Sequence, residues 1–251
     1  MSNCKFFVWC SSYDLHRVRQ AGKRQMTFAG FPKGLVGYLQ DLGKHNDKLW
    51  FEDHRADYEA NYTGPALDFI TAFAPIAEAF DPPLKSQPKI NGSLRRIHRD
   101  TRFSKDKTPY HTRLHMIFWA GDHPTRSPGL HVVISKDGFG CGAGHWGFDK
   151  DQLERYRTAL GDPKAVTALR KAIKTAQADG NLLDEPHLAK VPRGFDADGK
   201  NADLLRYKGL VMRADSIHPD ALFGKKAIDH ISKRANALMP LNRWLTRTVF
   251  T

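Results

Sequence analysis

Two runs of alternating residues, joined by a tight turn, restrict what this chain can fold into. Residues 129–135 place an apolar side chain at every second position, and residues 139–143 do so again. The intervening Lys136-Asp137-Gly138 is typical of a turn. The pattern predicts an antiparallel hairpin over residues 129–144. A similar alternation at residues 113–118 predicts one more strand beside it.

Helical spacing of apolar residues precedes and follows these strands. Helices are predicted over residues 34–44, from a cap at Asp47 to about residue 62, from Pro65 to Pro82, over 150–160, from Pro163 to about 180, over 202–207, and over 225–238 before Pro240. Another strand is expected at 209–213, and residues 181–200 read as irregular. Helices, then strands, then helices predict an α+β fold, a single domain with an antiparallel or mixed sheet packed against several helices.

The composition excludes several classes of protein. The 251 residues carry a formal net charge of +12, and 41% of them are hydrophobic, which is too apolar for a disordered chain. No apolar run approaches the roughly 18–20 residues of a membrane span, so no membrane partner is expected. Two of the three cysteines, Cys4 and Cys10, lie in the first ten residues, so no disulfide framework is expected. These features together favour a cytoplasmic protein.

The first 25 residues differ in composition from the rest. They are basic, and their apolar core at residues 6–10 is shorter than that of a signal peptide. We expect residues 1–25 to be a disordered extension, or to precede a true start at Met26. An organelle transit peptide and a segment that docks on the core are the alternatives. Residues 26–251 are then the globular domain.

A basic segment stands out within that domain. Residues 95–113 hold seven Lys or Arg side chains and two acidic ones. If the segment is extended, Arg96 and Arg102 share one face, and Phe103 lies on the other, where it would fill the core. Guanidinium groups suit carboxylates and phosphates, and interleaved acids would orient them.

This segment supplies most of the candidate site residues. The candidates for binding an anion are Arg96, Arg99, Arg102, Lys105, Lys107, Arg193 and Lys208. The candidates for orienting those cations, or for acid–base work, are Asp100, Asp106, His98 and His111. Three interpretations stay open, namely an anion-binding surface, an ion-pair network or solvated strand without a ligand, and an acid–base cluster. Arg193, Arg206 and Lys208 would reinforce the site if they faced residues 96–107.

The sequence also resembles a known family over nearly all of residues 28–247. Its most specific match is Arg99-Asp100-Thr101-Arg102-Phe103-Ser104-Lys105-Asp106-Lys107-Thr108-Pro109-Tyr110. Further matches are Phe31-Pro32, Asn46-Asp47-Lys48-Leu49-Trp50-Phe51, Gly142-Ala143-Gly144, Pro192-Arg193-Gly194-Phe195-Asp196, Leu204-Leu205-Arg206-Tyr207-Lys208 and Pro240-Leu241-Asn242-Arg243-Trp244-Leu245. The chain thus resembles the domain of unknown function 2461 family. The resemblance implies no particular activity. It begins near Met26, which agrees with the proposed extension.

Three other features are weaker. Residues 142–147 match G-x-G-x-x-G, the motif of dinucleotide-binding loops. They lie on a hairpin strand rather than at the start of a helix, so close approach of a backbone or a ligand is a better interpretation than dinucleotide binding. His111 and His115 lack a third metal ligand, so no metal site is expected. Cys141 is expected to be a small buried side chain rather than a nucleophile. No cofactor is indicated.

Two functional hypotheses follow, and the residues assign no reaction to either. In the first, the domain binds a small phosphorylated or carboxylated ligand, as a binding module or as an enzyme. In the second, the same segment binds nucleic acid electrostatically, which the overall charge favours but the interleaved acids do not. A scaffold without a small ligand is a third interpretation.

Overall fold

The computed structural model describes residues 28–214 and 218–251. Its five strands form one sheet in the order β1-β2-β3-β5-β4, and every neighbouring pair is antiparallel. The strands are β1 (Arg113–Trp119), β2 (Gly129–Ser135), β3 (Gly138–His145), β4 (Asn181–Leu183) and β5 (Leu210–Ala214). The α+β class is therefore confirmed, and the sheet is antiparallel rather than mixed. The predicted hairpin is β2 and β3, and the strand at 113–118 is β1.

Helices precede and follow the sheet, as the periodicity predicted. They are α1 (Gly34–Lys44), α2 (Lys48–Asp53), α3 (Arg55–Tyr58), the π-helical turn η1 (Glu59–Thr63), α4 (Gly64–Glu78), α5 (Lys150–Ala159), α6 (Pro163–Ala178), α7 (Ala202–Leu205), the 3-10 turn η2 (Pro219–Leu222) and α8 (Ala227–Thr248). The predicted cap at Asp47 is present, and α5 also begins with a cap. The Asp47 carboxylate accepts the Trp50 N–H at 3.0 Å, and Asp149 and Gln152 form a reciprocal capping box.

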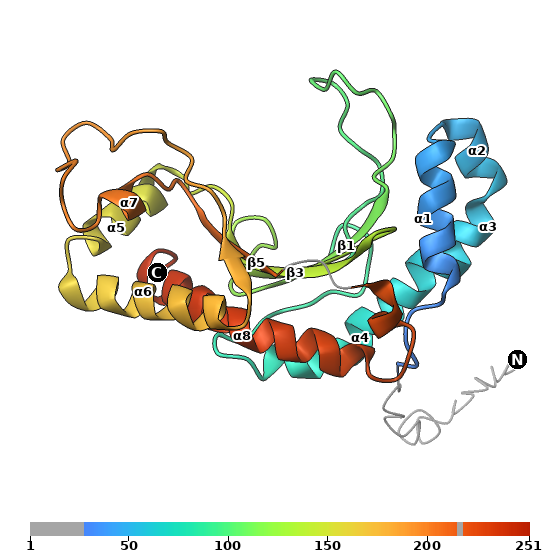
Figure 1. The fold of residues 1–251 in the computed structure, drawn as a ribbon. Helices are drawn as coiled ribbons and strands as arrows, with labels where there is room; N and C mark the ends of the chain where they lie inside the picture. Colours follow the sequence, from blue (N-terminus) through green and yellow to red (C-terminus); the bar gives the residue numbers. More distant parts are fainter. Residues whose placement is uncertain (1–27, 215–217) are drawn as a thin grey trace, which may run out of the picture.

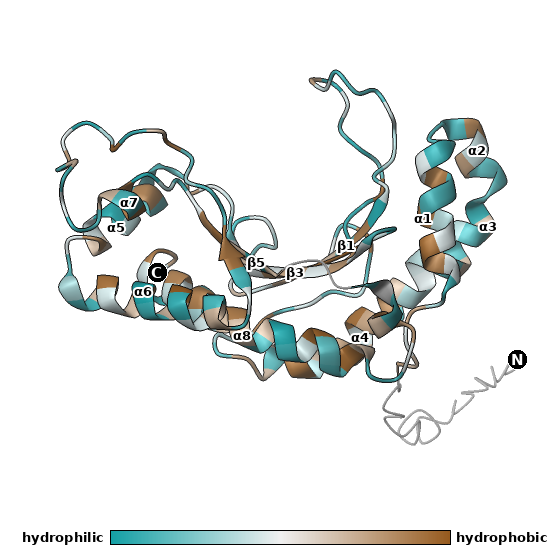
Figure 2. Ribbon diagram, viewed as in Figure 1, coloured by the Kyte–Doolittle hydropathy of each residue, from teal (hydrophilic) through white to brown (hydrophobic). Residues whose placement is uncertain are grey.

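The two faces of the sheet differ in what covers them. Helices α4, α6 and α8 lie along one face, and α8 packs directly on β3 (Figure 1). Apolar side chains at alternate strand positions, such as Val132, Phe139 and Met212, are fully buried there. The remaining positions point to the opposite side, which no helix of this layer covers and which we call the open face. Figure 2 shows that the loops rising above the sheet are coloured mainly as hydrophilic residues, whereas hydrophobic residues lie along the strands and along α4 and α8.

Three predicted elements need correction. The last helix continues through Pro240 to Thr248, because Leu241, Trp244 and Leu245 are buried in the core. Their burial outweighs the hydrogen bond that a proline removes from a helix. The helix predicted from Asp47 to residue 62 is broken near His54 into α2, α3 and η1. Residues 181–183, expected to be irregular, form the short edge strand β4.

Residues 96–102 do not form the extended segment that was considered from the sequence. Leu94 and His98 make single bridges, to Met116 and Tyr110, and residues 99–109 form a loop that projects from the sheet (Figure 1). The Arg99 N–H donates to the Pro109 carbonyl at 2.8 Å and closes the base of this loop. The alternation of faces assumed from the sequence therefore does not apply beyond residue 98.

Phe103 is the clearest error of that assumption, because its side chain is 96% exposed rather than in the core. We expect Phe103→Ala to change the free energy of unfolding by less than about 0.5 kcal/mol, since no buried surface is lost. Phe118→Ala is the matched control. Phe118 is fully buried, so its truncation should cost about 3–5 kcal/mol. Chemical denaturation of both variants measures the difference, and a loss above 2 kcal/mol in Phe103→Ala would contradict the exposed loop.

Two expectations concern the ends of the chain and membranes. The proposed extension at residues 1–25 lies outside the described residues. Within the described part of the chain, no helix combines the length and the apolar character needed to cross a bilayer.

Candidate functional site

The projecting loop is held together by its own charged groups. The Arg99 guanidinium donates to Asp106 at 2.5 Å and to the Thr108 carbonyl at 3.0 Å. The Arg102 guanidinium donates two hydrogen bonds to Asp100, at 3.0 and 2.8 Å, and the Arg102 backbone N–H donates a third, at 3.2 Å. Together they hold the pKa of that carboxyl at about 2. Asp100 and Asp106 thus orient the arginines, as one sequence interpretation proposed. The same pairs occupy the two guanidinium groups that an anion would need.

The other residues selected from the sequence do not converge on one point. Arg96, Lys105, Lys107 and His98 are exposed around the loop, and Lys107 donates to the Thr101 carbonyl at 2.9 Å. Burial is the main cause that lowers the pKa of His111, and Arg113, Arg99 and Arg96 lower it further. Arg193, Arg206 and Lys208 belong to the segments beside β4 and β5, at the opposite end of the sheet from the loop (Figure 1). These three therefore do not face residues 96–107.

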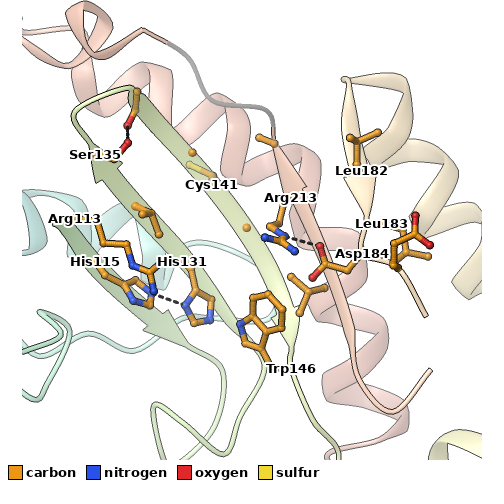
Figure 3. Close-up of a pocket in the computed structure, with 17 residues that line it drawn as sticks. Arg113, His115, His131, Ser135, Cys141, Trp146, Leu182, Leu183, Asp184 and Arg213 are labelled. Atoms are coloured by element: carbon orange, nitrogen blue, oxygen red, sulfur yellow. Dashed lines mark hydrogen bonds and ion pairs between the residues drawn. The ribbon is translucent and has the colours of Figure 1, made fainter. Parts of the chain in front are cut away.

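The structure instead has a cavity on the open face of the sheet (Figure 3). Its volume is about 720 Å³, within the range of small-molecule sites. It is lined by residues of all five strands and of the segments that follow β3 and β4. The lining residues are Arg113, His115, His131, Val133, Ser135, Gly138, Gly140, Cys141, Gly142, Trp146, Leu182, Leu183, Asp184, Glu185, Val211, Arg213 and Ala214.

Glycines form the floor of this cavity. Gly138, Gly140 and Gly142 occupy successive positions of β3 on the open face. Gly142 pairs with His131 of β2 on one side and with Arg213 of β5 on the other. The middle strand therefore carries no side chain where both of its neighbours do. Of these three glycines, only Gly142 belongs to residues 142–147, for which the sequence predicted close approach of a backbone or a ligand.

Two histidines stand side by side on one wall. His115 Nε2 and His131 Nδ1 are 2.9 Å apart, so one imidazole donates a hydrogen bond to the other. Burial lowers the pKa of His115 to about 3, and His131, Arg113 and Arg95 lower it further. Burial likewise lowers the pKa of His131 to about 4, helped by Arg95 and His145. Both imidazoles are therefore neutral at pH 7, and each keeps hydrogen-bonding capacity without charge.

Cations flank the histidine pair. Arg113 lines the cavity, and among the described residues its guanidinium has no hydrogen-bonding or ion-pair partner. Arg95 lies in the segment alongside β1, where its backbone N–H donates to the His115 carbonyl at 2.9 Å. Its charge acts on both imidazoles. The β1 side of the cavity is therefore positively charged.

The opposite wall of the cavity, on the β4 side, combines an ion pair with an aromatic ring. Arg213 Nε donates to Asp184 Oδ1 at 2.5 Å, and its guanidinium lies 5.1 Å from the centre of the Trp146 ring. Figure 3 draws Arg213 pointing toward Asp184. Glu185 completes this side of the lining. The β4 side thus carries two carboxylates, one of them paired, and an aromatic ring.

Two further features considered from the sequence are Cys141 and a bound metal. Cys141 is buried, and burial raises the pKa of its thiol to about 12, so the thiol stays protonated. It is the small buried side chain that was expected. Within residues 28–214 and 218–251 no group of three His, Cys, Asp or Glu side chains is arranged to hold a metal ion.

The candidate site residues chosen from the sequence do not include Arg113, His131, Trp146, Asp184 or Arg213. The signal for His131 and Arg213 was present, because both occupy polar positions in strands whose alternate residues are apolar. Asp184 had no such signal, since the strand before it was not recognised. The residue types favoured the basic segment 95–113 as the site. Arg113 is the one residue of that segment that lines the cavity.

Fold and site together define the class. This is an α+β protein with a five-stranded antiparallel sheet, helices on one face and a cavity lined by charged, aromatic, apolar and glycine residues on the other. The family model of conserved hypothetical proteins DUF2461 matches residues 35–244, and the chain belongs to that family. This confirms the resemblance seen in the sequence. No curated protein matches the chain, and no solved structure matches it.

Proposed function

We propose that the protein binds a small anionic ligand, a carboxylate or a phosphate, in the cavity on the open face of the sheet. The observation that carries the proposal is Arg113, a guanidinium without a described partner at the edge of this cavity. An arginine with its donors free favours bidentate binding of an oxyanion.

The surroundings of Arg113 support the same ligand. Arg95 adds a second positive charge on the β1 side, and the neutral His115–His131 pair offers hydrogen bonds to an oxyanion. In contrast, Arg99 and Arg102 of the loop already bind Asp106 and Asp100. The proposal therefore moves the anion from residues 96–107 to the cavity and keeps Arg96, Lys105 and Lys107 as a secondary basic surface.

Arg113→Ala is expected to weaken the binding of phosphate or a small carboxylate about tenfold, because one charged hydrogen-bonding group is lost. Arg102→Ala is the matched control, since it removes the same charge from a side chain that is 77% exposed outside the cavity. It should leave both affinity and melting temperature close to those of the parent protein. Isothermal titration calorimetry at ~50 and ~200 mM salt measures the affinities, which should fall with salt.

Three results would contradict the proposal. If Arg102→Ala abolishes binding and Arg113→Ala does not, the anion binds at the loop, as the sequence first suggested. If an oligonucleotide binds with a steep salt dependence while small anions do not bind, the nucleic-acid hypothesis is correct. If neither class binds, the scaffold interpretation is favoured.

A further inference from the structure

The two sides of the cavity carry opposite charge. Arg113 and Arg95 lie on the β1 side, whereas Asp184 and Glu185 follow β4 on the other. Arg213, which binds Asp184, stands on β5, and β5 is three strand spacings from β1, roughly 14 Å. An inorganic phosphate or an acetate ion would contact one side only. A ligand that uses the whole cavity is therefore elongated and differs chemically at its two ends.

The ring of Trp146 points to an aromatic group in that ligand. The Trp146 side chain is 54% exposed, and it lines the cavity beside His131 (Figure 3). The adjoining floor carries only Gly140 and Gly142, so a flat group meets no side chain there. Aromatic rings attract each other beyond the effect of their buried area, and a guanidinium such as that of Arg213 also stacks on a ring.

Asp184 points to a hydrogen-bond donor at the same end. Its Oδ1 accepts from Arg213, but its Oδ2 is buried and has no hydrogen-bond partner in the described structure. A buried carboxylate oxygen without a donor costs free energy, so such groups are nearly always satisfied. An N–H of a bound ligand would satisfy Oδ2.

We infer that the ligand is an elongated aromatic anion, with a heteroaromatic or amino-substituted ring against Trp146 and Asp184 and an anionic group at Arg113. Nucleoside monophosphates and aminoaryl carboxylates share this chemistry. The inference rests on the proposed function, because it takes the anion at Arg113 as given. It adds that the ring contributes to affinity and that the acidic side of the cavity recognises its N–H groups.

Two matched pairs of probes test the inference and distinguish the sources. Adenosine 5′-monophosphate is compared with ribose 5-phosphate, which lacks the ring, and 4-aminobenzoate is compared with benzoate, which lacks the N–H donor. We expect the first member of at least one pair to bind at least tenfold more tightly. A preference in the phosphate pair identifies a nucleotide, and a preference in the carboxylate pair identifies an aryl carboxylate.

Trp146→Leu should abolish the preference for adenosine 5′-monophosphate over ribose 5-phosphate without weakening ribose 5-phosphate itself. Phe103→Leu is the matched control. The Phe103 ring is also exposed and also contacts an arginine, since the Arg102 guanidinium lies 5.8 Å from its centre. Phe103 differs from Trp146 in that it lies on the loop, outside the cavity. Asp184→Asn is the second variant. It should reduce the preference for 4-aminobenzoate over benzoate. Melting curves of all three variants verify that they fold.

The outcomes separate this inference from the proposed function. If both members of each pair bind equally well, the ring is not recognised and the inference is wrong, while anion binding stands. If no probe binds, and neither does inorganic phosphate, both proposals are wrong. If the preference survives Trp146→Leu and is lost in Phe103→Leu, the ring binds at the loop and the cavity assignment fails.

Discussion

Acidification from pH 7.5 to 5.0 is expected to lower the free energy of unfolding by up to about 4 kcal/mol through the His115–His131 pair alone. The folded-state pKa values of about 3 and 4 lie below the ordinary histidine value of 6.5. Below pH 6.5 the unfolded chain therefore binds protons at these two imidazoles, whereas the folded protein leaves the imidazoles unprotonated. The free energy of unfolding therefore decreases as the pH is lowered. Each imidazole contributes about 1.4 kcal/mol per pH unit between 6.5 and its folded-state pKa. Urea denaturation at both pH values measures the loss.

The variant His115→Gln distinguishes the contribution of the histidine pair to this pH dependence from the contributions of other titrating groups. These include His111 and His145, whose pKa values are also lowered. With one imidazole removed, the loss between pH 7.5 and 5.0 should shrink by about 2 kcal/mol. The control is His230→Gln, which removes an exposed imidazole on α8 and should leave the loss unchanged. An identical loss in His115→Gln and in the parent protein would mean that the pair is not held neutral by burial.

Gly144→Ala is expected to destabilise the protein by at least about 3 kcal/mol. Gly144 has a φ of +131°, a conformation that L side chains rarely adopt. An added Cβ would overlap the Leu210 carbonyl oxygen and lie 2.9 Å from the Cα of Val211. Those atoms belong to β5, so relief of the overlap would separate β3 from β5 and divide the sheet. The melting temperature should fall by roughly 6–12 °C.

Gly140→Ala is the matched control on the same strand and the same face. Its φ is not positive, and the nearest atom to an added Cβ, the Ala214 carbonyl oxygen, is 3.5 Å away, an ordinary contact. We expect a change below about 1 kcal/mol. Thermal unfolding of both variants gives the comparison. Equal stability of the two would show that β3 can adjust at Gly144, and would remove the argument that this glycine holds the sheet together.

Elements with strong local signals were predictable from the sequence. Asp47 and Asp149 cap helices because a carboxylate satisfies free backbone N–H groups wherever a helix begins nearby. The hairpin of β2 and β3 follows from side-chain alternation and a turn at Lys136-Asp137-Gly138, which are also local. The α+β class followed from the order of these elements along the chain.

Errors occurred where distant contacts outweigh local preference. Pro240 is tolerated inside α8 because its neighbours are buried against the sheet and the other helices. β4 is only three residues long, and its pairing with β5 is a contact between segments almost thirty residues apart. Residues 99–109 are a different case, because the ion pairs Arg102–Asp100 and Arg99–Asp106 join residues only two and seven positions apart and stabilise a loop. The contacts of α8 and of β4 are not encoded in a local pattern.

Some features of the candidate site were likewise predictable from the sequence, and others depend on the tertiary structure. From the sequence alone came the class of the fold, the basic character of residues 95–113, the small residues of β3 and the buried, unreactive Cys141. Only the tertiary structure decided that Arg113 faces the cavity while Arg99 and Arg102 are paired in a loop. It alone placed His131, Trp146 and Asp184 around the glycine floor. The physical reason is that alternation assigns a residue to a face of its own strand, whereas a cavity depends on which strands become neighbours, and long-range packing determines that order.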